Sequence, residues 1–140
     1  MIVVDTNVIS ETTRVGGNPH VGKWLDSHLA ETLFVTATTL AELLAGLSTM
    51  PAGRRRRDLE TQLELLFARL FPDRILPFDE EAARQYGTVA GRARAGGIAL
   101  SMADGQIAAI AEARGFAVAT RDVKPFRGMG LRVINPWEQT

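Results

Sequence analysis

Short apolar runs alternate with segments of helical periodicity along the chain, and this alternation restricts the fold more than any other feature. The runs that predict strands are residues 2–4, 33–35, 75–76, 117–119 and 131–134. Between them, apolar residues recur every three or four positions over residues 21–29, 40–47, 59–70, 86–93 and 103–111. Strands that alternate with helices require crossover connections, which favour a parallel sheet. We therefore predict an α/β domain with helices on both faces of a parallel sheet.

The length and the amino-acid composition exclude several classes of protein. A chain of 140 residues is long enough for one domain with a substantial core, which we expect over residues 1–140. The absence of cysteine excludes disulfides and thiolate zinc sites. The apolar start reaches Asp5 after four residues, and no apolar run is long enough to cross a bilayer. We expect a cytoplasmic protein that has no membrane partner.

The charges of the chain balance, with 16 basic and 16 acidic residues. A protein that held nucleic acid by charge alone would normally be basic, because phosphate contacts supply most of the non-specific affinity. Any surface that binds nucleic acid must therefore be local.

Two acids follow directly after predicted strands. Asp5 ends the first strand, and Asp122 lies just past the fourth strand. Asp5 is also explained as the N-cap of a short helix, for which aspartate is a favoured residue. Asp122 is also explained as a turn residue, or as the partner of Arg121 in an exposed salt bridge of little energetic value. Neither acid alone establishes a site.

Two further acids are expected in the first turns of helices. Glu42 stands three residues after Thr39, and Asp104 stands three residues after Ser101. This is the spacing of a capping box, in which the acid bonds back to the helix start. Taken singly, capping is the better explanation of both.

Taken together, the four acids predict a metal site. The carboxyl ends of parallel strands and the N-termini of the following helices meet at one edge of the sheet. Carboxylates gathered there would repel one another and raise each other's pKa unless a cation neutralised them. Mg²⁺ or Mn²⁺ is the expected cation, because both prefer oxygen ligands. His20 and His28 are too few to favour zinc, and on one predicted helix they would lie about 12 Å apart, too far to flank one phosphate.

Four blocks of the sequence resemble those of a known family. The blocks are DTNVISE at residues 5–11, TTLAEL at 38–43, ADGQIA at 103–108 and TRD at 120–122. ILPFD at 75–79, Phe126 and NPW at 135–137 add to the likeness. In this order and spacing, the chain resembles the PIN domains over nearly its whole length, and most closely the VapC and FitB toxins of bacterial toxin–antitoxin pairs.

The resemblance implies a three-layer α/β/α domain with a central parallel sheet. It also implies a Mg²⁺-dependent endoribonuclease that hydrolyses RNA and is neutralised by a cognate antitoxin. By likeness of position, the catalytic and metal-binding acids are Asp5, Glu42, Asp104 and Asp122. Many relatives carry asparagine at the last of these positions. Thr6, Asn7 and Thr120 would support the acids or face a phosphate.

A run of four arginines is the densest charge cluster of the chain. It consists of Arg54, Arg55, Arg56 and Arg57 at the expected start of a helix. Cations at a helix N-terminus oppose the macrodipole, so a partner anion would explain them, whether an RNA phosphate or an antitoxin carboxylate. The alternative is that the four arginines are simply solvent-exposed charges at the start of the helix.

Two leucine stripes offer more apolar surface than one sheet needs. They consist of Leu40, Leu43, Leu44 and Leu47, and of Leu59, Leu63, Leu66 and Leu70. We expect a homodimer or a dimer of dimers, and the alternative is that both stripes belong to the core. Trp24 and Trp137 are better explained by packing than by base stacking, since aromatic residues form only 6% of the chain.

Three other functions remain as alternatives. A phosphohydrolase of the haloacid-dehalogenase kind also begins with a strand that ends in aspartate, but it needs a second acid where this chain has Asn7. A receiver-like signalling domain carries a late Lys-Pro, which Lys124 and Pro125 resemble. It also needs a phosphoacceptor aspartate after a mid-chain strand, and no acid lies between Glu42 and Asp58. The third alternative is a PIN fold that only binds a partner.

Overall fold

A five-stranded parallel sheet forms the centre of the molecule. The computed structural model describes residues 1–138, so the last two residues of the expected domain lie outside the described residues. The strands are β1 (Ile2–Val4), β2 (Leu33–Thr36), β3 (Ile75–Leu76), β4 (Ala117–Ala119) and β5 (Val133–Ile134), in the order β3-β2-β1-β4-β5. All pairings are parallel, as predicted. The fifth strand begins two residues later than expected, because Leu131 N donates instead to Phe126 O at 3.3 Å.

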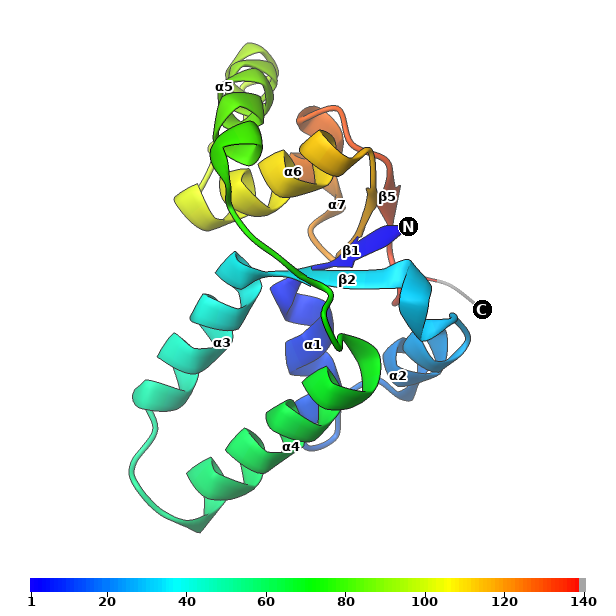
Figure 1. Ribbon diagram of the computed structural model, residues 1–140, viewed down its shortest axis with the longest axis vertical. Coiled ribbons are helices and arrows are strands. Elements are labelled where there is room, and N and C mark those ends of the chain that lie inside the picture. The colour runs from blue at the N-terminus through cyan, green and yellow to red at the C-terminus, as the bar shows by residue number, and fades with distance from the viewer. Residues whose placement is uncertain (139–140) are drawn as a thin grey trace.

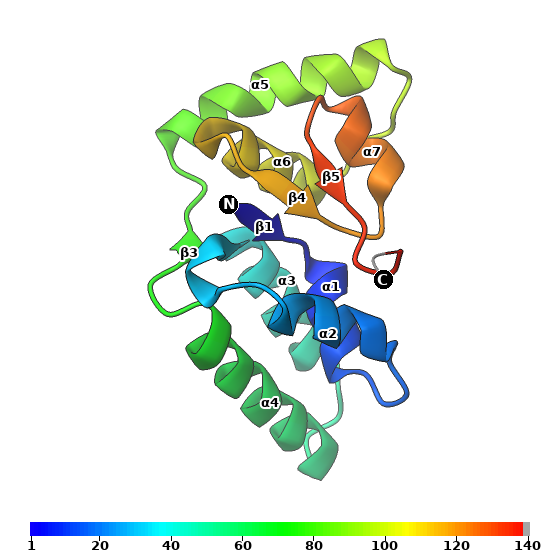
Figure 2. The same cartoon turned by 90° about the vertical axis from the view of Figure 1, so that its right-hand side faces the viewer.

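Helices cover both faces of this sheet. One face carries α5 (Glu80–Ala95), α6 (Met102–Arg114) and α7 (Val123–Gly128). The other carries α1 (Thr6–Thr13), α2 (Pro19–Asp26), α3 (Ala37–Ser48) and α4 (Arg54–Leu70), with a 3-10 turn at Ala30–Thr32 before β2 (Figures 1 and 2). The predicted three-layer α/β/α architecture is confirmed. Over residues 1–138, no helix combines the length and apolar character needed to cross a membrane.

Alternation along the strands divides the core into two halves. Ile2 and Val4 pack with the α1–α4 layer, whereas Val3 between them packs with the α5–α7 layer. Neighbouring side chains of a strand point to opposite faces, so an unbroken apolar run is what a sheet covered on both sides requires. Every residue of β1 and of β4 is therefore buried.

The strand order reverses at β1, which decides where a ligand can bind. From β1 the chain builds β2 and β3 on one side, and it then returns to build β4 and β5 on the other side. The crossovers diverge at this point and leave a crevice beyond the carboxyl ends of the two central strands. Asp5 follows β1, and residues 120–122 follow β4.

Two local predictions are wrong, and one short helix was not predicted. Thr36, not Thr39, caps α3, because its hydroxyl accepts the Thr39 N–H at 3.0 Å, and Glu42 therefore lies in the second turn. Helix α2 ends at Asp26, so His28 lies beyond the helix that was expected to contain both histidines. Helix α7 was not predicted, since its six residues are too few to display a helical period.

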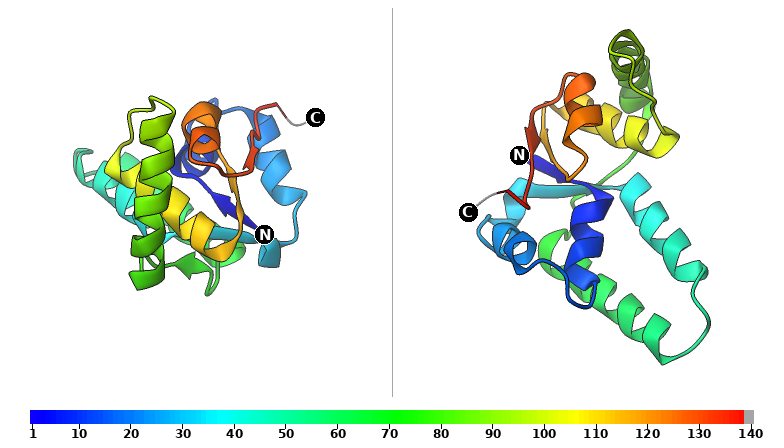
Figure 3. Two further views of the ribbon diagram at one scale, coloured as in Figure 1. Left: turned by 90° about the horizontal axis from the view of Figure 1, so that it is seen from above. Right: turned by 180° about the vertical axis from the view of Figure 1, so that it is seen from behind.

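Helix α3 is poorly covered, although it is apolar. Its only buried residues are Thr39 and Leu47, and Leu44 is 53% exposed. Helices α3 and α4 extend together away from the sheet (Figure 3). Between them and β3 lies a groove of about 450 Å³, whose apolar lining consists of Leu40, Leu43, Leu44, Leu47, Leu63, Phe67 and Ile75. The second stripe is mostly core, as the alternative held, but the first is not.

We predict that this groove is covered by a second copy of the chain. Light scattering at micromolar concentration should give the mass of a dimer or a larger even-numbered assembly. Leu44→Glu should give a monomer, because a carboxylate in an apolar interface loses its hydration. Leu65→Glu is the matched control, because Leu65 is 66% exposed on another side of α4 and its replacement should leave the mass unchanged. A monomeric wild-type protein would rule the interface out.

Candidate active site

Asp5 lies at the bottom of the crevice and is nearly inaccessible, with 3% of its surface exposed. It is the N-cap of α1, and its Oδ1 accepts the Thr6 N–H at 2.8 Å. Its Oδ2 accepts the Thr120 hydroxyl at 2.7 Å. Burial raises the pKa of Asp5 from 3.8 to about 6; the two hydrogen bonds oppose this rise, and the charges of Asp104 and Asp122 add to it. Capping and a place in the site are thus compatible.

Glu42 reaches the same crevice from the second turn of α3. Its carboxylate accepts the Thr6 hydroxyl at 2.6 Å, and that hydroxyl also lies 3.0 Å from the hydroxyl of Thr39. The expected capping box is absent here, because Thr36 takes the capping role three residues earlier. Glu42 is therefore held by α1 and not by its own helix end.

Asp104 enters from the N-terminus of α6, as expected. The Ser101 hydroxyl accepts the Asp104 N–H at 3.1 Å, which confirms the predicted cap and leaves the aspartate half-buried in the first turn. Burial raises the pKa of Asp104, and the charges of Asp122 and Glu42 raise it further. Asp104, Asp122 and Glu42 all line the same cavity, so their charges act on one another.

Asp122 is attached to the other acids through Asn7. The Asn7 amide donates to the Thr120 hydroxyl at 3.2 Å and to Asp122 at 3.4 Å. The Asp122 N–H also donates to the Thr120 hydroxyl, at 3.0 Å. Among the ion pairs of residues 1–138, none joins Asp122 to Arg121, so the expected alternative of a salt bridge is not seen.

The four acids line one cavity of about 510 Å³. Its remaining walls come from Thr6, Asn7, Ser10, Glu11, Arg14, Arg121 and Trp137. The acids are not closely packed, because within residues 1–138 no three Asp, Glu, His or Cys side chains are grouped tightly enough to hold a metal ion. Three of the four carboxylates accept hydrogen bonds from neutral side chains.

The donors in this cavity fit a hard divalent cation. Every acidic ligand is a carboxylate oxygen, and no histidine lines the cavity. Mg²⁺ retains several waters and is commonly bound through only one or two carboxylates. Such an ion needs no closely packed cage, and spaced acids can contact it through its water shell. The charges of Asp104 and Asp122 add to the rise in the pKa of Asp5, so these carboxylates repel one another across the cavity.

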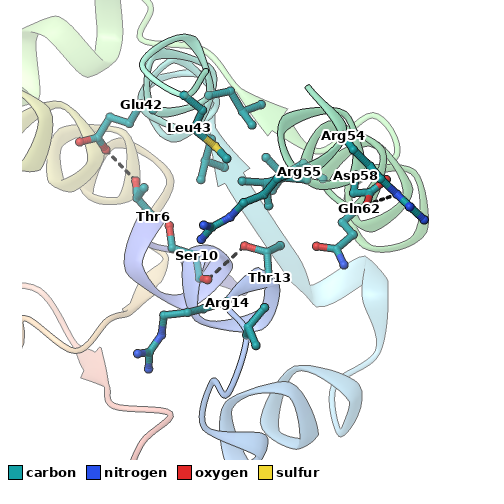
Figure 4. Close-up of a pocket in the computed structure, with 16 residues that line it drawn as sticks. Thr6, Ser10, Thr13, Arg14, Glu42, Leu43, Arg54, Arg55, Asp58 and Gln62 are labelled. Carbon is teal, nitrogen blue, oxygen red and sulfur yellow. Dashed lines mark hydrogen bonds and ion pairs between the residues drawn. The ribbon is translucent and has the colours of Figure 1, made fainter. Parts of the chain in front are cut away.

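A second cavity adjoins the first and contains part of the arginine run. It has a volume of about 770 Å³, lies between α1, α3 and α4, and shares Thr6, Ser10, Arg14 and Glu42 with the acidic cavity (Figure 4). Arg54 and Arg55 line its far side. Arg56 instead donates to Met50 O at 3.3 Å and pairs with Glu60, and Arg57 is exposed. The four arginines therefore do not form one patch.

Glu11 belongs to the cavity but was not singled out from the sequence. It is only 6% exposed, and it pairs with Arg14. One signal could have found it: Glu11 lies four residues after Asn7, on the same face of α1. Lys124 and both histidines are not among the lining residues. Trp137 packs against the core, as expected, and also forms part of the cavity wall.

Fold and site together define an α/β domain with a carboxylate cavity at the carboxyl edge of its parallel sheet. Residues 2–130 match the family model described as PIN domain. The VapC ribonuclease Y4jK of Sinorhizobium fredii is 47% identical over 99% of each chain. The toxin FitB of Neisseria gonorrhoeae is 42% identical over 98% of this chain and 99% of its own. This chain belongs to the PIN-domain family, which confirms the resemblance seen in the sequence.

The solved structures agree with this assignment. The crystal structure of FitAcB from Neisseria gonorrhoeae superposes with a TM-score of 0.91 and 41% identity, over 99% of this chain and 100% of the other.

The buried charge of Asp5 predicts how stability depends on pH. The pKa of Asp5 is higher in the folded protein than in the unfolded chain, so its contribution is fully present below about pH 4 and is lost as pH rises through about 6. Without metal, Asp5→Asn should therefore raise the free energy of unfolding at pH 7.5 by on the order of 2–3 kcal/mol.

Thermal melting in EDTA followed by circular dichroism measures this effect. The melting temperature of Asp5→Asn should exceed that of the wild type at pH 7.5, and the two should converge near pH 4. Asp26→Asn is the control, since Asp26 is exposed and its pair with Arg69 is worth little. If the melting temperatures of Asp5→Asn and of the wild type differed by the same amount at pH 4 and at pH 7.5, the raised pKa of Asp5 would be contradicted.

Proposed function

We propose that this protein is a Mg²⁺-dependent endoribonuclease and acts as the toxin of a toxin–antitoxin pair. The observation that carries the proposal is the convergence of four carboxylates from four different segments on one cavity. The names of two close relatives, a ribonuclease and a toxin, support it. Mn²⁺ would serve in the same way, because it shares the preference for oxygen ligands.

The side chains of the cavity have separate roles in this proposal. A bound divalent ion would lower the pKa of an attacking water and stabilise charge on the leaving oxygen of the RNA phosphodiester. Asp5, Glu42, Asp104 and Asp122 would hold that ion directly or through its waters. Thr6 orients Glu42, and Thr120 orients Asp5. Because these supports are neutral, they fix the acids without reducing the negative charge that attracts the cation.

The alternative functions fit these contacts less well. A phosphohydrolase of the haloacid-dehalogenase kind would need a second acid at the position of Asn7. The Asn7 amide instead donates to Asp122, and its oxygen accepts the Arg121 N–H. A receiver would need its lysine in the acidic pocket, and Lys124 does not line the cavity. A pure binding module would gain nothing from burying Asp5, because that charge costs stability above pH 6.

We predict that Asp5→Asn and Asp104→Asn each abolish cleavage of single-stranded RNA while the fold persists. The loss should exceed the roughly 10- to 100-fold effect typical of losing an outer partner of a metal ligand. Cleavage is measured with Mg²⁺, with Mn²⁺ and with EDTA, and circular dichroism reports the fold. The control is again Asp26→Asn, which should cleave at the wild-type rate. Full activity in either cavity variant would refute the proposed site.

The second cavity suggests how an antitoxin would inhibit the enzyme. Its apolar wall includes Leu43, Leu47, Met50, Leu59 and Leu63. It adjoins the acidic cavity, with which it shares Thr6 and Glu42 (Figure 4). An amphipathic segment of the antitoxin would cover this wall. A cationic side chain from the same segment would enter the acidic cavity. Arginine is best suited, because its planar fork can pair two carboxylates at once and keeps its charge.

We predict that Mg²⁺ and the antitoxin compete for the four acids. The affinity for the antitoxin should fall as MgCl₂ is added, and it should fall further than in NaCl of equal ionic strength. Isothermal titration in both salt series measures the difference. Equal weakening in the two series would mean that the antitoxin binds away from the acids.

A further inference from the structure

Two arginines share the acidic cavity with the four carboxylates. Arg14 follows α1 and Arg121 follows β4, and they are the cations among the described residues that line the cavity. Neither forms an ion pair with Asp5, Glu42, Asp104 or Asp122 within residues 1–138. They therefore do not serve to neutralise the acids and need another explanation.

A buried carboxylate fixes Arg14. Glu11 accepts the Arg14 guanidinium on both oxygens, at 3.0 Å for Oε2, and its Oε1 also accepts the Asn18 N–H at 3.0 Å. The loop closes tightly over this pair: a β-carbon at Gly17 would lie 2.3 Å from the Glu11 backbone oxygen, which excludes any other residue. The Arg14 side chain remains 61% exposed. It is thus held in place at one edge and open to a ligand at the other.

Arg121 lines the same cavity and is held by an aromatic ring. Its guanidinium carbon lies 5.2 Å from the centre of the Trp137 ring, a favourable cation–π distance. Trp137 itself forms part of the cavity wall. The charge of Arg121 adds slightly to the lowering of the Glu11 pKa, which is caused mainly by Arg14 and by the Asn18 N–H. Glu11 balances one of the two arginines, so a single positive charge remains among these three residues of the cavity lining.

We propose that Arg14, held by Glu11, and Arg121, held by Trp137, bind a backbone phosphate of the RNA next to the phosphate that is cut. This inference rests on the proposed ribonuclease function. A chain with no net charge, and with four acids in its cavity, repels a polyanion unless cations lie close by. Arginine forks match phosphate oxygens, and a rigidly held fork loses little entropy on binding. The pair thus compensates the repulsion where the substrate enters.

RNA fits this wall better than an acidic peptide does. The cavity presents four carboxylates beside two guanidinium groups, so its ligand must be acceptable to both walls. A polyphosphate backbone meets that condition, because one phosphate is screened by the metal at the acids while its neighbour meets the arginines. A peptide carboxylate at the arginines would not by itself explain why they share a cavity with a metal site.

The salt dependence of RNA binding tests the proposal. The wild-type chain must first be shown to cleave single-stranded RNA. Binding of a fluorescently labelled 12-nucleotide RNA is then measured by anisotropy between about 50 and 200 mM KCl, in the cleavage-deficient Asp104→Asn background. Each phosphate contact that is lost reduces the magnitude of the slope of log K against log [KCl] by about 0.7 for a single strand. Because the two arginines bind one phosphate, the double variant should show this full reduction, and Arg14→Gln and Arg121→Gln should each show part of it.

Arg114→Gln is the matched control. Arg114 is exposed at the C-terminus of α6, before β4 begins, and so lies at the opposite edge of the sheet. Its replacement removes the same charge and should leave the slope unchanged. Long-range attraction alone would instead lower affinity equally in all three single variants.

The role of Glu11 is tested by a double-mutant cycle. Glu11→Gln keeps the side-chain shape but releases the charge that holds Arg14, so in the cleaving enzyme it should raise KM more than it lowers kcat. In an Arg14→Gln background the same change should add little, because the group that it positions is gone. A purely structural role would give additive effects.

The proposal is overturned if the double arginine variant binds RNA with the wild-type slope. If that variant also loses affinity for the antitoxin, the arginines belong to a protein interface instead. A wild-type chain that neither binds nor cleaves RNA would refute the ribonuclease function itself, and this result is visible before any variant is compared.

Discussion

The hydrogen bond from the Thr120 hydroxyl to Asp5 joins the carboxyl ends of β1 and β4, the two strands that border the crevice. The same hydroxyl accepts from Asn7 and from the Asp122 N–H, so one buried oxygen takes part in three hydrogen bonds and joins residues 5–7 to residues 120–122. Its donors and acceptors are fully used in a place where an unpaired polar group would cost about 1–3 kcal/mol. The geometry of the acidic cavity depends on this small neutral network.

Neutral support has an electrostatic consequence. A site built to attract a cation cannot fix its acids with lysine or arginine, because an internal cation would cancel the charge that the metal must find. In this protein the acids are held by hydroxyl, amide and backbone donors. The two arginines of the cavity are instead held by Glu11 and Trp137. Both signs of charge thus coexist in one cavity without cancelling.

The arrangement of the helices gives the site its surroundings. Helices α3 and α4 leave the sheet together, so an apolar groove and the second cavity flank the acids and are not filled by the chain itself. Glu42 and Leu44 lie on the same exposed helix, which connects the chemistry of the site with the surfaces available to partners. An enzyme whose activity is controlled by association has a use for such incompletely covered elements.

The sequence by itself determined the strands, the three layers and the edge at which the acids meet, because strand alternation and helix periodicity are local signals. It also gave the Ser101 cap beside Asp104, a contact between near neighbours. Only the tertiary structure decided that Thr36 caps α3 and that Glu11 is buried beneath its own loop. It also decided that Arg54 and Arg55 line a cavity whereas Arg56 bonds to the backbone of Met50. These features depend on contacts between segments brought together by the sheet, and such contacts leave no period in the sequence.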